Sequence, residues 1–95
     1  MFYVYALRST KDGQMYVGST KDLKHRLKQH NNGDVFSTRP RRPLELVYYE
    51  AYKSEYDARM RESRLKLRSK AFVQLRKRIQ DSLRCCGSRG EWFQP

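Results

Sequence analysis

The chain has 95 residues, of which 38% are hydrophobic, so it can build one small core and not two domains. Its 21 Lys and Arg residues outnumber its 10 Asp and Glu residues, and the formal net charge of +11 predicts a polyanionic partner, most often nucleic acid. No apolar run approaches the roughly 18 residues of a membrane-spanning helix, which excludes an integral membrane protein.

Residues 2–8 are rich in aromatic and β-branched types and predict a strand. The Asp-Gly pair at residues 12–13 supplies the backbone freedom of a tight turn. Residues 14–17 form the expected return strand, which we expect Gly18 to end. A β-hairpin therefore opens the chain.

A helix is predicted next, with Thr20 as its N-terminal cap. Leu23, Leu27 and His30 share one helical face, and Asn31-Asn32-Gly33 ends the helix. An arginine- and proline-rich loop follows over residues 34–43.

Residues 44–52 predict a third strand, and their largely continuous apolar character favours a central, well-buried position. Ser54 and Asp57 resemble a capping box that starts a helix through about residue 68. A further helix is expected over residues 70–83. The predicted fold is α+β, a three-stranded antiparallel sheet flanked by about three α-helices. It occupies residues 1–84, and residues 85–95 form an aperiodic, flexible tail.

The positive charge is concentrated near the C-terminus. Residues 59–84 contain ten Lys and Arg against two acids, a net charge of +8. A solvated helical face is the alternative explanation, but such faces normally mix both signs. We therefore expect nucleic-acid contacts from a set of cations in the 34–43 loop and the later helices: Arg39, Arg41, Arg42, Arg61, Arg64, Lys66, Arg68, Lys70, Arg76, Lys77 and Arg78.

Some polar side chains interrupt the packing pattern. Glu62 lies on the predicted inner face of its helix, where a carboxylate must be paired or bound to a metal. An ion pair with an arginine is favoured on geometry alone. Arg26 and His30 are one helical turn apart, and Tyr5 and Tyr16 are candidates to face each other across the hairpin. Taken by itself, His30 is explained by stabilisation of the helix C-terminus, and the two tyrosines are explained by cross-strand aromatic packing. Together the five groups can converge on one polar cleft.

Several segments, in this order, resemble the GIY-YIG nuclease superfamily, in particular its stand-alone, single-domain members. They are residues 3–5 (Tyr-Val-Tyr), 16–18 (Tyr-Val-Gly), 22–31, 43–50 and 59–66. The resemblance extends from about residue 2 to about residue 82. The chain departs from the family pattern in having Tyr3 at the first-motif glycine and Val at both isoleucines, and residues 68–84 contain no match to the late asparagine.

The resemblance implies a metal-dependent endonuclease that hydrolyses DNA phosphodiesters, in repair or in processing of branched or damaged DNA. It assigns one Mg²⁺ or Mn²⁺ ion to Glu62 and a phosphate oxygen to Arg26. Either Tyr5 or Tyr16 would orient or deprotonate the attacking water, and cations nearby would have to lower that phenol's pKa. His30 would polarise a phenol, and Gly18 would let the backbone approach the phosphate.

Other functions remain open at this point. A non-catalytic nucleic-acid-binding domain of the same fold is the first, and a basic protein that docks on ribosomal RNA or an acidic protein is the second. RNA is equally open as a substrate. The small core leaves no room for an organic cofactor. The adjacent Cys85 and Cys86 cannot link distant segments, and no basic-then-apolar leader is present, so we expect a cytoplasmic setting.

Overall fold

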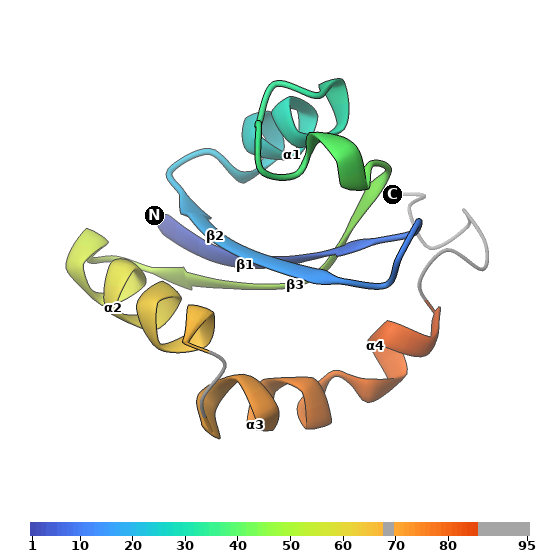
Figure 1. Cartoon of the computed structure of the whole chain (residues 1–95). Coiled ribbons are helices and arrows are strands. Elements are labelled where there is room, and N and C mark those ends of the chain that lie inside the picture. Colours follow the sequence, from blue (N-terminus) through green and yellow to red (C-terminus); the bar gives the residue numbers. More distant parts are fainter. Residues whose placement is uncertain (68–69, 86–95) are drawn as a thin grey trace.

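A computed structural model describes residues 1–67 and 70–85, and confirms the α+β class (Figure 1). Three antiparallel strands form one sheet in the order β2-β1-β3. Helix α1 lies over one face, and α2, α3 and α4 follow one another across the other face (Figure 1). The predicted tail lies outside the described residues from residue 86 onward, as does the candidate cation Arg68.

The opening hairpin consists of β1 (Phe2–Ser9) and β2 (Met15–Thr20). Gly13 adopts a positive φ of 74° in the turn, as the Asp-Gly pair predicts. The prediction that Gly18 ends β2 is wrong, because Gly18 pairs with Tyr5 and the strand continues to Thr20. Backbone pairing to β1 outweighs the weak strand preference of glycine at this position.

The prediction that the third strand is central is also wrong. Strand β3 (Leu44–Tyr52) has its predicted bounds but lies at an edge of the sheet, and β1 is central. Val4, Tyr5, Ala6 and Leu7 of β1 are all buried, whereas exposure alternates along the second half of β3. Tyrosines account for the apolar character of that half, and they tolerate partial exposure because each carries a hydroxyl.

Helix α1 (Leu23–Asn32) ends as predicted, at Gly33 with φ 85°. Its cap is Asp22 and not Thr20, because the Asp22 carboxylate accepts the His25 backbone N–H at 3.1 Å. Thr20 acts one step earlier, its hydroxyl accepting the Asp22 N–H at 3.1 Å.

Helix α2 (Glu55–Lys66) begins at the predicted Ser54 cap, whose hydroxyl accepts the Asp57 N–H at 3.4 Å. The single helix expected over 70–83 is instead two, α3 (Lys70–Arg78) and α4 (Gln80–Cys85). The helix breaks at the buried Ile79, and Leu83 of α4 packs against the core. The Arg8 side chain of β1 donates to the Leu83 carbonyl, which anchors α4 to the sheet.

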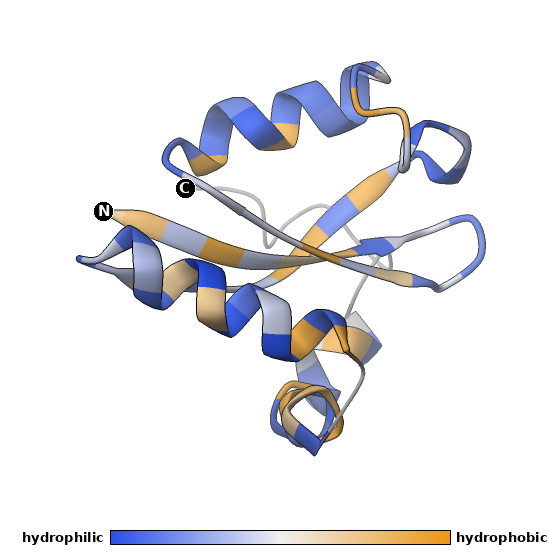
Figure 2. Cartoon of the chain, turned by 60° about the vertical axis from the view of Figure 1, so that its left-hand side comes forward, coloured by the Kyte–Doolittle hydropathy of each residue, from blue (hydrophilic) through white to orange (hydrophobic). Residues whose placement is uncertain are grey.

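Alternation along the strands divides the core between the two sheet faces. Val4 and Ala6 join the larger cluster with α2 and α3, while Tyr5 and Leu7 join a smaller cluster with α1. Figure 2 shows hydrophobic stretches along the strands and within α2 and α3. Within the described ranges, no helix is long and apolar enough to cross a membrane.

Candidate active site

A buried chain of polar groups lies beneath α1. The Tyr5 hydroxyl is 2.9 Å from Nε2 of His30, and Nδ1 of His30 is 2.8 Å from the Thr38 hydroxyl. The Thr38 hydroxyl donates to the Val35 carbonyl at 3.5 Å. This last bond assigns the other protons: Nδ1–H donates to Thr38, so Nε2 accepts from Tyr5.

Burial sets the charge state of both members of the Tyr5–His30 pair. It raises the pKa of Tyr5 to about 12, although the Arg26 guanidinium acts to lower it. Burial, assisted by the positive charge of Arg26, lowers the pKa of His30 to about 4. Both groups are therefore neutral at pH 7, with Tyr5 as proton donor and His30 as acceptor. The cations that were expected to lower the phenol pKa do not outweigh burial at Tyr5.

Tyr16 is the more accessible of the two tyrosines. It is half-buried, and its ring centroid lies 5.1 Å from that of His30 and 6.4 Å from that of Tyr5. The two tyrosines are diagonal neighbours, since Tyr5 pairs with Gly18 and Tyr16 pairs with Leu7. A half-buried phenol can reach a bound water, which a fully buried one cannot.

Gly18 has a steric role that the motif alone does not reveal. A Cβ atom at this position would lie 2.5 Å from the Tyr5 hydroxyl oxygen and 3.1 Å from Cε2 of Tyr16. Any larger residue would push Tyr5 away from His30. The structure therefore explains Gly18 through the packing of Tyr5, and its approach to a phosphate stays a prediction.

Glu62 lies on α2, on the opposite face of the sheet from Tyr5. Its side chain is 19% exposed; Oε1 accepts from the Ser19 hydroxyl at 2.7 Å, and Oε2 lies 2.7 Å from Nζ of Lys66. Burial acts to raise the pKa of Glu62, but the hydrogen bonds from Lys66 and Ser19 outweigh it, so the pKa is lowered. The carboxylate is ionised at neutral pH, and its cationic partner is a lysine and not the expected arginine.

Lys66 connects the two halves of the site. Its Nζ contacts Glu62 and also lies 5.9 Å from the centroid of the Tyr16 ring. The charge of Glu62 in turn acts on the titration of Tyr5. Because β2 is an edge strand, groups from both faces can meet at this edge. Four of the five predicted catalytic positions lie together on the α1 face: Tyr5, Tyr16, Arg26 and His30. Glu62 lies across the β2 edge and is connected to Tyr16 through Lys66.

The donor set fits a hard divalent cation. Among the described residues, no group of three or more His, Cys, Asp and Glu side chains converges. Glu62 is the carboxylate to which the family resemblance assigns the ion. Mg²⁺ commonly binds through one or two carboxylates and keeps several waters. Ionised, partly exposed Glu62 meets that requirement once Lys66 releases Oε2.

Comparison with known proteins identifies the family of the chain. The family model described as the GIY-YIG catalytic domain matches residues 1–79. The chain belongs to the GIY-YIG family. Domains of this family are typically endonucleases that bind nucleic acid and generally use divalent metal ions.

Several UPF0213 proteins are similar to this GIY-YIG chain. One from Clostridium perfringens is 43% identical over 67 residues, covering 70% of this chain and 71% of its own. One from Staphylococcus saprophyticus is 40% identical over 65 residues, covering 67% and 78%. The solution NMR structure of a UPF0213 protein from Bacillus halodurans is 36% identical with a TM-score of 0.47, covering 93% of this chain and 89% of that one. These names specify no activity.

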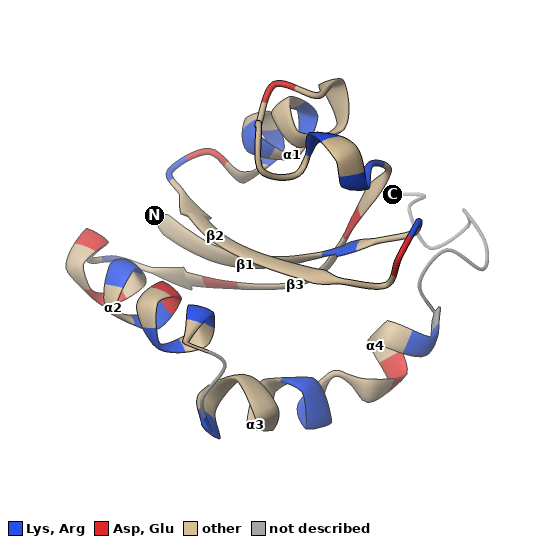
Figure 3. Ribbon diagram, in the orientation of Figure 1, with Lys and Arg blue, Asp and Glu red and all other residues tan. Residues whose placement is uncertain are grey.

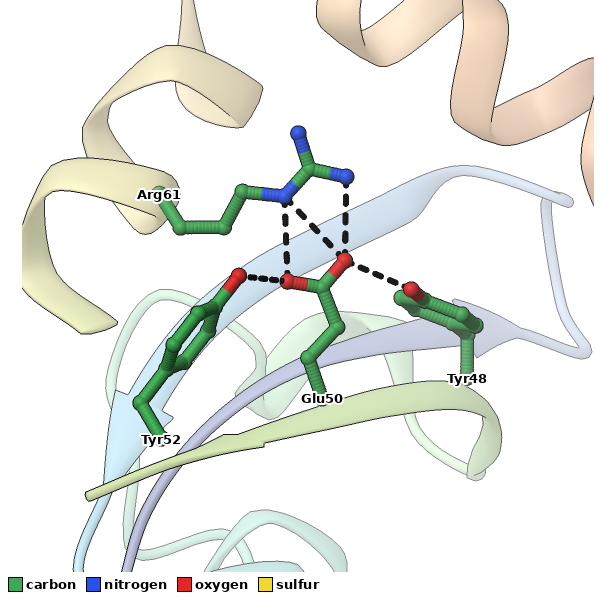
Figure 4. Close-up of polar contacts among 4 residues, drawn as sticks. All are labelled: Tyr48, Glu50, Tyr52 and Arg61. Carbon is green, nitrogen blue, oxygen red and sulfur yellow. Dashed lines mark hydrogen bonds and ion pairs between the residues drawn. The ribbon is translucent and has the colours of Figure 1, made fainter. Parts of the chain in front are cut away.

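The cations predicted to contact nucleic acid are not equivalent in this GIY-YIG domain. Figure 3 shows Lys and Arg on helices at both faces of the sheet. Arg61 is committed elsewhere: its Nε and Nη2 atoms contact Glu50 at 2.9 to 3.1 Å (Figure 4). Arg41 is half-buried. The remaining described candidates are exposed: Arg39, Arg42, Arg64, Lys66, Lys70, Arg76, Lys77 and Arg78.

Two residues that support the GIY-YIG site escaped prediction. Ser19 donates to Glu62, and Thr38 is the buried partner of His30. Strand alternation provides a signal for Ser19, because Val17 and Ser19 must face the same side of the sheet. No local pattern marks Thr38, which lies in the irregular 34–43 loop.

Proposed function

We propose that this protein is a metal-dependent endonuclease that hydrolyses phosphodiester bonds in DNA, with branched or damaged DNA as its substrate. The observation that carries the proposal is the buried Tyr5–His30–Thr38 chain on the α1 face together with the ionised Glu62 on the α2 face, which Lys66 connects to the Tyr16 ring across the β2 edge. A domain that only binds nucleic acid needs exposed cations. It has no use for a buried phenol–imidazole pair, which is costly to desolvate.

Glu62 would hold the Mg²⁺ or Mn²⁺ ion, which when bound would neutralise charge on the scissile phosphate and the leaving oxygen. Lys66 already neutralises Glu62, so the ion and Lys66 would compete for Oε2. Once displaced, the Lys66 ammonium group is free to contact a neighbouring phosphate. Arg26, half-buried beside Tyr5, would hold a phosphate oxygen as negative charge builds.

We assign the orientation of the attacking water to Tyr16 and not to Tyr5. Tyr16 is half-buried, whereas Tyr5 is fully buried and its proton is used by His30. The water oxygen forms the new bond to phosphorus as the bond to the leaving oxygen breaks; the attacking water loses a proton to solvent, and the leaving oxygen takes one from solvent. Tyr5 and His30 act as positioning residues that hold the Tyr16 ring, since the His30 ring packs edge-to-face against it.

One observation favours the alternative of a non-catalytic nucleic-acid-binding domain. Both oxygens of Glu62 already have partners in Ser19 and Lys66, as in a purely structural pair. Metal-dependent cleavage would distinguish the endonuclease from the non-catalytic binding domain.

The test is a nicking assay on supercoiled DNA, branched DNA and a matched RNA, each with Mg²⁺ and with chelator. We expect chelator-sensitive cleavage of DNA, strongest on the branched form. Binding to all three without cleavage of any would support the non-catalytic domain.

A further inference from the structure

A cavity opens on the α1 face of the sheet, away from Glu62. Its volume is about 400 Å³, and it lies between the N-terminal part of α1 and strands β1 and β3. Tyr3 and Tyr49 line it from the sheet, and Leu23 and Leu27 from the helix. Pockets for small organic groups begin at roughly 300 Å³, so the cavity can hold one flat ring system.

The aromatic side chains that line this cavity, Tyr3 and Tyr49, are not packed into the hydrophobic core. The Tyr3 and Tyr49 rings meet edge-to-face with centroids 6.0 Å apart, and Tyr49 is 53% exposed. A tyrosine face left open in this way stacks on a nucleobase of any sequence.

Positive charge accompanies the aromatic wall. Lys21 and Lys24 line the cavity and are exposed. Asp22 also lines the cavity, where its carboxylate caps α1 by accepting the His25 N–H, so the lining carries two positive charges and one negative charge. A ring-sized apolar space with two lysines matches a nucleotide, whose base is flat and whose phosphate is anionic.

The cavity is also connected to the candidate active site. Tyr49 pairs with Tyr5 across β1 and β3, so the aromatic wall borders the buried Tyr5. Lys21 also lines a neighbouring cavity of about 220 Å³ together with Ser19, which donates to Glu62. A nucleic-acid strand can therefore follow the surface from Glu62 past Lys21 to the Tyr3–Tyr49 cavity.

We propose that the Tyr3–Tyr49 cavity binds an unpaired nucleobase of the strand being cleaved, with Lys21 and Lys24 on its phosphate. The proposal rests on the proposed function and names its substrate class: strands with an unstacked nucleotide next to the cleavage position. Within a duplex, neighbouring pairs cover both faces of a base, so the cavity discriminates against fully paired DNA.

The test measures binding by the full chain in chelator, using fluorescence anisotropy with labelled oligothymidylate, oligouridylate and a blunt duplex. Tyr49→Ala should weaken binding of the single strands by roughly 5- to 150-fold, the equivalent of one stacked base, and leave duplex binding unchanged. Tyr49→Phe keeps the ring and should bind like the parent chain. Tyr56→Ala is the matched control, since Tyr56 is 69% exposed on α2. The two single strands distinguish DNA from RNA as the source of the base.

Lysine variants supply a second measurement if Tyr49→Ala lowers the melting temperature. Lys24→Ala should reduce single-strand affinity more than duplex affinity, whereas Lys28→Ala, one turn along α1, should affect both equally. Equal losses for single strand and duplex in Tyr49→Ala and Lys24→Ala, or no loss, would overturn the cavity proposal. Because binding is read without metal, a failure of cleavage leaves this result intact. If the parent protein cleaves DNA while Tyr49→Ala binds single strands as tightly as the parent, the cavity proposal is refuted and the proposed function is not.

Discussion

Two polar clusters with tyrosines lie on opposite faces of the same sheet, one partly buried and one fully buried, and they are built differently. On the α2 face, Glu50 receives the Arg61 guanidinium and the hydroxyls of Tyr48 and Tyr52 (Figure 4). On the α1 face, the Tyr5–His30–Thr38 chain contains no ionised group at pH 7. The first cluster carries paired opposite charges, and the second is neutral.

The polar groups of the Glu50 cluster are bonded to one another, because Glu50 accepts from Tyr48, Tyr52 and Arg61. Burial acts to raise the pKa of Glu50, but hydrogen bonds from Arg61 and the two tyrosines outweigh it, and the pKa is lowered. Such a carboxylate has no capacity left for a ligand, and it fastens α2 to β3. The neutral chain instead packs against the half-buried Tyr16, whose ring is accessible to solvent. The comparison indicates that one cluster stabilises the fold and the other serves chemistry.

The largest expected effect is at Glu62. Glu62→Gln removes the charge that would hold the metal while keeping the side-chain volume and the Ser19 contact. We expect cleavage to fall by about three orders of magnitude, equivalent to about 4 kcal/mol in the barrier. Stability should change little, because the Ser19 contact is kept and the half-exposed Lys66 is solvated when its i,i+4 pair with Glu62 is lost. Nicking rates and melting temperatures measured together check this, and a Gln variant that still nicks at the parent rate contradicts it.

Glu50→Gln should show the reverse pattern. It leaves the Arg61 guanidinium, whose side chain is only 26% exposed, without its counter-charge. We expect a loss of about 2–3 kcal/mol in unfolding free energy, somewhat below the cost for a fully buried pair. Cleavage by the folded fraction should persist. Glu55→Gln is the matched control, because its i,i+4 pair with Arg59 is exposed and contributes under about 0.5 kcal/mol. Equal denaturation midpoints for the two variants would show that the Glu50 cluster does not stabilise the fold.

The pH dependence of stability should report the neutral chain. The pKa of His30 is about 4 in the folded protein and ordinarily 6.5. Between these two pH values the imidazole is protonated in the unfolded chain and neutral in the folded chain. His30 thus favours folding fully above pH 6.5, and this contribution is lost as the pH falls toward 4. Between pH 6.5 and 5 the loss should reach about 2 kcal/mol, at 1.36 kcal/mol per unit. Glu50 and Glu62 titrate lower and do not contribute in this window.

Chemical denaturation at intervals across that range measures the slope, and His30→Gln provides the control. The variant should be less stable at pH 7 but nearly flat between pH 6.5 and 5. The same slope in both proteins would place the pH dependence elsewhere.

Local features of the fold could be predicted from the sequence, whereas contacts between distant segments could not. The hairpin, the bounds of β3, the Ser54 cap and the inner-facing Glu62 all follow from local periodicity and turn chemistry. The break at Ile79 does not, because residues 70–83 have one continuous helical pattern and the sheet surface decides where it bends. Ser19 and Thr38 were not predicted as site residues, and Lys66 was predicted only as a nucleic-acid contact and not as the partner of Glu62. Which loop residue meets His30, and which cation reaches Glu62, depends on the path of the chain between elements.

The smallest expected effect compares two hydrogen-bonded phenols, the buried Tyr5 and the partly buried Tyr48. Tyr5→Phe removes the proton donor to Nε2 of His30 and leaves that buried nitrogen without a partner, at a cost of about 1 kcal/mol in stability. Tyr48→Phe removes one of several hydrogen bonds to Glu50, which retains Arg61 and Tyr52, so its cost should be smaller. Cleavage should fall by about tenfold in Tyr5→Phe, because the imidazole that packs against Tyr16 loses its anchor, and remain at the parent level in Tyr48→Phe. Denaturation midpoints and nicking rates of the two variants decide the matter. Equal activity in both would place Tyr5 with the structural tyrosines and leave Tyr16 as the phenol of the site.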